Sequence, residues 1–564
     1  MQPIRMHDDL PRIAATTRAT VDWLLGRQSR DPASRDCGGF PDAETGYADS
    51  RNSIYALQTL FAAYLTPLLP EWHGNPELLE RLESGLGFMQ RRQRANGIVM
   101  LGANAAPCCA EIGFTIPAVL ATWERARASA LPGAARIAAV LAAYLERGGE
   151  ALRTLRPMTS NHRWTACTGP LALLDKHFPH PGNRAVIDDL VSDGLDITAE
   201  GMWYEERSPN YNMVADWGML WLADGLGERR FLEAAWRNAR LSLRLRQPSG
   251  EADTTFSHRQ DRGVPGRPWA EWWIMRRLSL EFADGELATA ADGLAAAFDP
   301  KAAPLIPLAY LAEDPRFAAD TVPRLPLPTA GELEVDGWLW RWRDGARAAT
   351  VVADHGGHWW DFIHGTWGAP LRNATVMSCH HGAAVIDGIK LVWGTGAGCF
   401  RPERIARGPD GALVLTADDY GFDHQEHYRP EAKRRPPHLA WNQPARMEIR
   451  RDAAGFAISG EVAGEPDCPV NLQLLLRTDA TLAVDGAAPL AITGGRATFS
   501  GGGAYVLHGT DGKALRITGL PASESRYRLG DATSVCGQAE RDAHRLIVAG
   551  FTPFRFAFRL DFNG

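Results

Sequence analysis

The sequence lacks a dense cysteine framework, an excess of basic residues and any long apolar run. Eight cysteines are scattered over 564 residues without a CxxC pair, which favours free thiols in a reducing compartment over a disulfide scaffold. Acidic residues outnumber basic ones by 67 to 60, and the net charge is −7. Surfaces that bind nucleic acid carry a basic excess, so this balance argues against such a partner. The cysteines are Cys37, Cys108, Cys109, Cys167, Cys379, Cys399, Cys468 and Cys536.

The first ten residues contain acidic side chains and no continuous apolar segment, whereas a signal peptide requires one. No window has the apolar length that is needed to cross a bilayer, so we expect no membrane contact. We therefore expect a cytoplasmic protein; a periplasmic or secreted location would apply if a leader had been removed. The oligomeric state is open, with a homodimer among the options.

The first three hundred residues have the periodicity of helices. Ile54, Leu57, Phe61, Tyr64 and Leu65 fall on one helical face, and similar apolar stripes recur every 20 to 40 residues between loops rich in Gly, Pro and Asp. Such stripes are typical of helical hairpins packed in series. No repeat of fixed period is present, which argues against a regular solenoid. We therefore predict an (α/α) toroid or incomplete barrel over residues 1–325.

The pattern changes after a proline-rich stretch at 299–331, because proline at this density stops helices. Trp338, Trp340 and Trp342 then alternate with other residues up to Asp344-Gly345, which indicates a strand and a hairpin turn. Many short strands of this kind predict an antiparallel β-sandwich over 326–564, and so an α+β multidomain chain. Further Asp-Gly pairs begin at positions 387, 410, 485 and 511, and Phe554, Phe556, Phe558 and Leu560 alternate near the end.

The segment Asn161-His162-Arg163 lies at a predicted helix start, with Ser160 or Asn161 as the N-cap and Pro170 bending the helix interior. The N-terminus of a helix presents unpaired N–H groups and a partial positive charge, so a carboxylate can bind there. The side chains of these three residues add further donors. The alternative is a capping asparagine followed by a surface His-Arg pair.

A second segment, Glu200 to Tyr211, places tyrosines, carboxylates and an arginine in a loop between helices. A neutral tyrosine is a good acid toward a leaving oxygen, and it becomes a base when nearby cations such as Arg207 or His162 favour the phenolate. Tyr204 and Tyr211 are equally compatible with simple packing roles. Glu205 and Glu206 offer a carboxylate pair for hydrolysis instead.

Histidines cluster near the start of the predicted sandwich. His355, His358, Asp361 and His364 have spacings that are compatible with a zinc or calcium site. His380 and His381 follow, but alternate residues of a strand point to opposite faces, so the two cannot face one site. Two further residues, Arg51 and Asn52, follow Asp49 at a predicted helix N-cap, from which Arg51 could reach into the central cleft of a toroid.

These residues together resemble the heparinase II/III-like polysaccharide lyases, a group that includes oligoalginate lyases. The resemblance rests on Asn161-His162 at a helix entrance, on the segment Glu200-Gly-x-x-x-Glu-x-x-Ser-Pro-x-Tyr211, and on a helical domain that precedes a histidine-bearing sandwich. It implies β-elimination on a glycan that contains uronic acid. Asn161 and His162 would neutralise the uronate carboxylate, Tyr211 would act as the acid with the role of base also open to it, and His380 or His381 would complete the site.

The chain departs from the family pattern in two places. Asn212 follows the tyrosine where the family has histidine, and Cys379-His380-His381 does not reproduce the family's zinc motif. The reaction itself needs no cofactor, and zinc or calcium would have only a structural role. The alternatives are a toroid glycoside hydrolase with a carboxylate pair and a non-catalytic carbohydrate-binding protein. The residues expected to contact the acidic oligo- or polysaccharide are Arg51, Asn52, Arg163, Trp164, Trp203, Tyr204, Glu206 and Arg207.

Overall fold

The structure is a computed structural model, in which the chain folds into two compact units. The first contains Met1–Glu205, Asn210–Leu243 and Arg267–Leu327, and the second contains Glu206–Pro209, Arg244–Gly266 and Pro328–Gly564. The structure describes residues 6–101, 109–157, 160–204, 207–257, 261–263, 266, 269–301, 305–315, 320–353, 375–394, 398–422, 439–485, 489–529 and 543–562.

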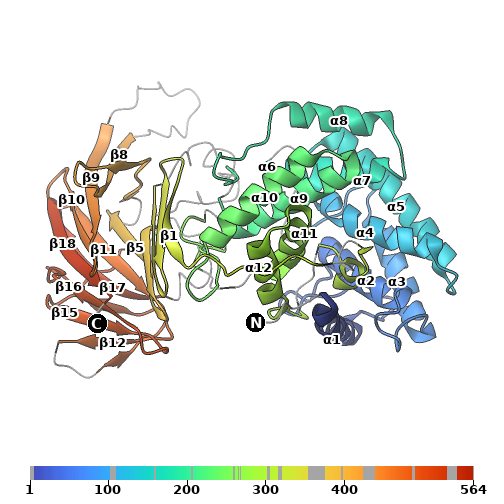
Figure 1. The fold of residues 1–564 in the computed structure, drawn as a ribbon, viewed down its shortest axis with the longest axis horizontal. Helices are drawn as coiled ribbons and strands as arrows, with labels where there is room; N and C mark the ends of the chain where they lie inside the picture. Colours follow the sequence, from blue (N-terminus) through green and yellow to red (C-terminus); the bar gives the residue numbers. More distant parts are fainter. Residues whose placement is uncertain are drawn as a thin grey trace, which may run out of the picture. The chain divides into compact units, whose positions relative to one another are not determined.

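The first unit is helical (Figure 1). Its helices are α1 (Met6–Arg27), α2 (Ser50–Leu65), α3 (Pro76–Arg92), α4 (Ala110–Ala128), α5 (Ala134–Leu155), α6 (Ser160–Arg163), α7 (Gly169–Asp175), α8 (Pro181–Ser192), α9 (Pro209–Leu226), α10 (Arg229–Arg244), α11 (Trp272–Phe282), α12 (Gly285–Ala295) and α13 (Leu308–Ala312). A π-helix at Trp164–Thr168 joins α6 to α7, and a short 3₁₀-helix at Trp269–Glu271 precedes α11.

Inner and outer helices alternate along this unit. Fourteen of the sixteen residues of α2 are buried, whereas only six of the seventeen residues of α3 are. A helix that is buried all round lies inside a structure, and one with a single apolar stripe lies on its surface. By the same criterion α4 and α9 belong to the inner set, and α5 and α8 to the outer set.

A buried ion network joins the beginning of the helical unit to its end. Arg276 of α11 has no exposed surface, and its guanidinium contacts Asp9 of α1 at 2.9 Å and Asp292 of α12 at 2.6 Å. Asp320 contacts Arg276 at 3.1 Å and Arg324 at 2.8 Å. Because α1 also packs against α2 and α13, the succession of helices returns to its start. The predicted toroid is confirmed.

The second unit contains two nine-stranded sheets, stacked in Figure 1. The first sheet has the order β1-β2-β3-β4-β5-β11-β17-β14, with β6 paired to β5, and the second has the order β13-β12-β15-β16-β18-β10-β9-β8-β7. All pairs are antiparallel except β14 with β17, so the predicted antiparallel sandwich is confirmed. The strands of the first sheet are β1 (Ala330–Val335), β2 (Leu339–Asp344), β3 (Arg347–Val352), β4 (Thr375–His381), β5 (Ala384–Trp393), β6 (Gly398–Cys399), β11 (Pro469–Leu476), β14 (Ala497–Phe499) and β17 (His544–Phe551). Those of the second are β7 (Ile405–Arg407), β8 (Leu413–Phe422), β9 (Leu439–Arg451), β10 (Gly455–Val462), β12 (Thr481–Val484), β13 (Leu490–Ala491), β15 (Ala504–His508), β16 (Ala514–Thr518) and β18 (Phe554–Asp561).

The local strand signals were mostly correct. Asp344 pairs with Arg347 across a two-residue turn in which Gly345 has a φ of 58°, as the Asp-Gly signal predicts. Residues of β18 alternate between buried and more exposed positions. The Asp387-Gly388 pair is an exception, because it lies inside β5 rather than in a turn. The register between β5 and β11 shifts beside Gly388, and the shift leaves Asp387 out of the regular pairing.

No helix among the described residues is long and apolar enough to cross a membrane.

Candidate functional site

The segment with Asn161 and His162 forms a helical turn that leads into a π-helix. The helix begins at Ser160, so Ser160 and Asn161 lie inside its first turn and are not the N-cap as expected. The side chain of Asn161 lies outside the described part of the structure. The backbone N–H of Gly169 donates to the carbonyl of Trp164 across five residues, and Pro170 then occupies the first turn of α7, where its missing N–H is tolerated.

Glycines allow this π-helix to lie close to two inner helices. A Cβ on Gly113 of α4 would lie 1.8 Å from the carbonyl oxygen of Ala166, and one on Gly218 of α9 would lie 2.6 Å from the backbone of Trp164. Thr165 also donates a hydrogen bond to the carbonyl of Val214 in α9. The π-helix is therefore fixed between α4 and α9. π-Helices are rare, and many of them occur at functional sites.

The N-terminal parts of the inner helices α2, α4 and α9 meet in an apolar cluster next to His162 of α6. The His162 ring packs edge-on against Phe114 of α4, with 5.4 Å between ring centroids. The Tyr55 hydroxyl of α2 donates to the carbonyl of Phe114 at 2.9 Å. Tyr55, Phe114 and Ala166 share one apolar cluster, and Val214 of α9 packs against it. The positive ends of several helix dipoles therefore point to one region.

Arg51 and Glu111 lie one helical turn beyond this cluster. On α2, Arg51 lies four residues before Tyr55, and on α4, Glu111 lies three residues before Phe114. The Arg51 guanidinium contacts the Glu111 carboxylate at 3.1 Å, and the Glu111 side chain is only 7% exposed. The N-cap predicted for this helix is confirmed, because Asp49 accepts a hydrogen bond from the backbone of Asn52. The side chain of Asn52 is exposed.

Tyr211 lies in the first turn of α9 rather than in the preceding loop, because α9 begins at Pro209. Its side chain is half-buried. Val214, one turn along the same helix face, packs against the cluster beside His162. Asn212, at the position where the resemblance predicts histidine, is buried and donates to the sulfur of Met202. It therefore supports the loop from inside the unit.

Arg163 and Trp164 are held by one carboxylate. Asp196 accepts from Arg163 at 2.8 Å and from the Trp164 indole at 3.0 Å, and Arg163 stacks over the Trp164 ring at 4.2 Å. Trp164 has no exposed surface, so it supports the start of the helix from behind. The backbone N–H of Tyr204 donates to the Asp196 carbonyl at 3.0 Å, and the Tyr204 side chain is exposed.

Trp203 is also buried, and its indole donates to the Asp216 carboxylate of α9 at 3.0 Å. Burial raises the pKa of Asp216 well above its ordinary value, although the hydrogen bond from Trp203 acts in the opposite direction. Gly201, in the same loop, adopts a φ of 104° and lies against α10, where a Cβ would meet the Arg237 carbonyl at 2.5 Å. The Asp216 carboxylate therefore binds Trp203 inside the core of the helical unit.

We predict that Asp216→Asn raises stability at neutral pH and leaves any activity nearly unchanged. An amide oxygen still accepts from Trp203, and the cost of burying a charge disappears. The folded pKa lies above the unfolded value near 3.8, so wild-type stability falls as pH rises between these two values. The advantage of the variant should be absent below about pH 4 and grow above it. Thermal unfolding over a pH series measures this, and a lost activity in a folded variant would instead indicate a catalytic carboxylate.

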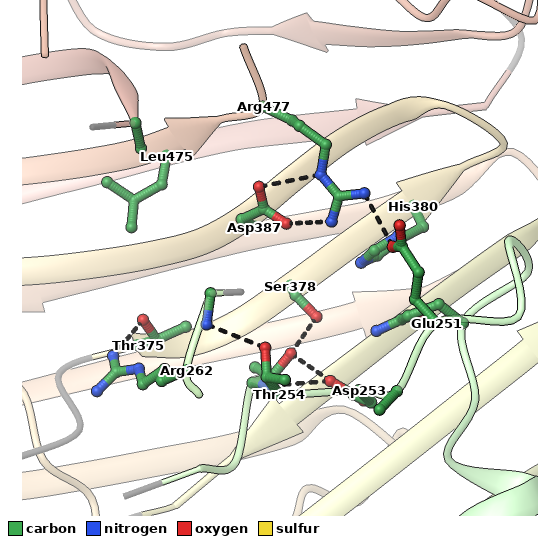
Figure 2. A pocket seen from close by; sticks show the side chains of 15 residues that line it. Glu251, Asp253, Thr254, Arg262, Thr375, Ser378, His380, Asp387, Leu475 and Arg477 are labelled. Atoms are coloured by element: carbon green, nitrogen blue, oxygen red, sulfur yellow. Dashed lines mark hydrogen bonds and ion pairs between the residues drawn. The ribbon is translucent and has the colours of Figure 1, made fainter. Parts of the chain in front are cut away.

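A small polar cavity lies in the sandwich unit (Figure 2), between the first sheet and the segment Arg244–Gly266. Arg477 contacts Asp387 at 2.7 Å and Glu251 at 3.0 Å. A second set of contacts includes the Thr255 and Ser378 hydroxyls at 2.7 Å and a bond from Arg262 to Thr375 at 2.6 Å. The cavity volume of about 30 Å³ is suited to a water molecule rather than a sugar ring.

The two sandwich histidines face opposite sides of the first sheet, as predicted. His380 lines the cavity and is 3% exposed, and burial, followed by the charges of Arg477 and Arg341, holds its pKa well below the ordinary value. His381 hydrogen-bonds with the carbonyl of Ala514 in the second sheet at 2.7 Å and packs against Phe562. His380 is thus neutral at physiological pH, and His381 is a contact between the sheets.

Arg207 belongs to the sandwich unit, where it stacks over Trp338 at 4.3 Å and is 6% exposed. Its neighbour Ser208 donates to Asp261 at 2.6 Å. Glu205 and Glu206 lie outside the described residues, as do His355, His358, Asp361 and His364. Within the described ranges, no group of three or more His, Cys, Asp or Glu side chains is arranged to hold a metal ion.

No protein-family model and no curated protein sequence matches this chain. Solved structures do. Chondroitin AC lyase from Streptomyces coelicolor, in complex with chondroitin sulphate, has a TM-score of 0.56 at 13% identity over 98% of this chain and 79% of its own. A heparinase III has a TM-score of 0.52 at 10% identity over 97% and 84%. A Paenibacillus xanthan lyase has a TM-score of 0.51 at 13% identity over 98% and 57%. The likeness establishes the fold, which is the toroid-plus-sandwich fold of these polysaccharide lyases.

Sequence reasoning missed two residues at the helix ends. Asp196 has no local signal, because its partners Arg163 and Trp164 lie more than thirty residues upstream. Glu111 is a carboxylate within the largely apolar segment Ala110–Leu120. A charged residue in such a segment is rarely buried without a partner, and this signal could have identified Glu111.

Proposed function

We propose that the protein is a polysaccharide lyase that cleaves an acidic, uronate-containing glycan by β-elimination. The observation that carries the proposal is the meeting of the N-terminal parts of α2, α4 and α9 next to His162 of α6, which brings Arg51, His162 and the first turn of α9 into one region of the helical unit. The fold shared with chondroitin AC lyase, heparinase III and xanthan lyase supports it.

The reaction requires three functions, for which the helical unit has residues. Asn161 and His162 donate hydrogen bonds to the uronate carboxylate, which stabilises the negative charge that develops when the C5 proton leaves. The helix N-termini add partial positive charge to the same region. The electron pair of the C5–H bond becomes the C4–C5 double bond, and the C4–O bond breaks. Tyr211 donates its proton to the departing glycosidic oxygen.

Tyr211 is also our candidate for the base: as the phenolate it takes the C5 proton, and the same proton then passes to the departing oxygen, which restores the phenolate. The chemistry as proposed needs no cofactor. Of the three nearby aromatic side chains named from the sequence, only Tyr204 is exposed, and we assign it the substrate contact. Trp164 and Trp203 support the site through Asp196 and Asp216.

A direct assay tests the function. The protein is incubated with several uronate polymers and their short oligomers, and ultraviolet absorbance reports the new C4–C5 double bond. We expect absorbance to rise together with the appearance of reducing ends. Reducing ends without absorbance would support hydrolysis, and binding without either would support a carbohydrate-binding protein.

We further propose that His380, rather than His381, is the histidine that the sandwich contributes to the reaction. His381 is held between the two sheets by the Ala514 carbonyl and the Phe562 ring, whereas His380 lies on the other side of the first sheet and lines the polar cavity. We expect His380→Asn to lower kcat about a hundredfold. The matched variant His381→Asn should keep its rate and lose about 1 kcal/mol of stability with the Ala514 hydrogen bond. The reverse pattern in kcat would assign the role to His381.

A further inference from the structure

Three arginines, two of them close to His162 in the sequence and one at the start of α2, are already paired with carboxylates of the helical unit. Arg51 pairs with Glu111 at 3.1 Å. Arg163 contacts Asp196 at 2.8 Å and Asp193 at 3.3 Å. Arg156, which follows α5 and precedes this helix, contacts Asp189 at 2.8 Å. The positive charges of these three side chains are therefore balanced before any substrate binds.

Breaking the ion pairs of Glu111 and Asp196 to bind a ligand would cost free energy, because these two carboxylates are largely buried. The Glu111 and Asp196 side chains are 7% and 23% exposed. If Arg51 turned to an anionic ligand, the buried Glu111 carboxylate would lose an ion pair at 3.1 Å, and breaking a buried ion pair is costly. Asp196 is bound to the Trp164 indole as well as to Arg163, so releasing it would also disturb the helix start.

The described residues at the start of α2 add a further negative charge. Asp49 caps α2 at the same end as Arg51. The whole chain has a net charge of −7, which disfavours the approach of a densely charged polyanion.

A uronate and a sulfate ester make different demands on such a region. One carboxylate per sugar can be bound by neutral donors such as an amide or an imidazole N–H and by helix N-termini. Every sulfate ester adds another full negative charge, and its recognition normally uses an arginine that is available to it. We propose, on the basis of the lyase function above, that the substrate is a polyuronate whose sugars carry no sulfate esters.

The test compares matched polymers. Chondroitin, heparosan, alginate and polygalacturonate are each supplied without sulfate and in a sulfated form, and kcat/KM is measured from the C4–C5 double bond. For each backbone that is cleaved, we expect the unsulfated form to react at least about tenfold faster. Equal or faster reaction of the sulfated form would overturn this inference and leave the lyase function intact. No double bond from any polymer would refute the lyase function, and the inference with it.

Variants test the charge argument itself. Glu111→Gln releases Arg51 from its ion pair, and we expect the ratio of sulfated to unsulfated kcat/KM to rise about tenfold. Asp193→Asn changes an exposed partner of Arg163 and should shift the ratio in the same direction without affecting folding. The control is Glu150→Gln, which removes an exposed carboxylate from its ion pair with Arg153 on α5 and should leave the ratio unchanged. Ratios in Glu111→Gln and Asp193→Asn equal to that of the control would overturn the inference.

Discussion

Replacing Tyr211 by phenylalanine is expected to lower kcat about a thousandfold, which is within the range of general acid–base catalysis. The substitution removes only the hydroxyl, and the half-buried ring can keep its place in the first turn of α9. The loss should appear in kcat rather than in KM, because proton transfer to the leaving oxygen occurs in the transition state. Steady-state kinetics on a polymer that the wild-type protein cleaves, with thermal unfolding of both proteins, measures this.

A matched control is Tyr47→Phe. Tyr47 lies in the loop before α2, where its ring is under the guanidinium of Arg92, and the loss of its hydroxyl should leave kcat unchanged. A near-normal rate for Tyr211→Phe would show that another group supplies the proton. A thousandfold loss accompanied by a lower unfolding temperature would point to packing rather than to proton transfer.

Arg276→Met is expected to destabilise the helical unit by about 3–5 kcal/mol, which is typical when one partner of a buried ion network is removed. Arg276 is completely buried and contacts Asp9, Asp292 and Asp320. Without it the three carboxylates lose their shared cation, and Arg324, which contacts Asp292 and Asp320, compensates for only part of the charge. Calorimetry of the first unfolding transition, combined with denaturant titration, measures the loss.

The control for this variant is Arg184→Met on α8. Arg184 pairs with Asp188 at 2.7 Å, but both side chains are more than half exposed. Exposed pairs of this spacing contribute about 0.3–0.5 kcal/mol, so the control should unfold close to the wild-type temperature. Similar stability of the two variants would mean that the network adds little to closure of the ring.

Local signals in the sequence predicted local structure well. Asp49 caps α2, Asp344-Gly345 turns the chain between β2 and β3, and the phenylalanines of β18 alternate in burial. In each case the cause lies within a few residues: a side-chain oxygen near free N–H groups, a glycine at positive φ, or a strand period of two.

Features set by distant contacts were not predictable in this way. Asp387-Gly388 has the composition of a turn but lies in β5, where Asp387 meets Arg477 ninety residues later. The segment Arg244–Gly266 reads as a connection between helices, yet it belongs to the sandwich unit and is bound there by Arg341 and Ser378. In both cases the partner residues lie far away in the sequence, so no local pattern indicates the contact.

The candidate site was partly predictable for the same reason. His162 and Tyr211 are recognisable by residue type beside helix starts. The helix packing that brings them together depends on Gly113 and Gly218, whose role is visible only when α4 and α9 lie against the π-helix. Which aromatic side chains are exposed depends equally on the fold, and so the burial of Trp164 and Trp203 was missed.

The π-helix at Trp164–Thr168 also sets the angular position of His162. An α-helix advances about 100° per residue, and a π-turn holds one residue more than an α-turn. If one residue were deleted from this turn and α7 kept its packing, the residues on the N-terminal side would rotate by about 100° about the helix axis. His162 would then leave the edge of Phe114. The length of this one turn therefore determines in which direction the His162 side chain points.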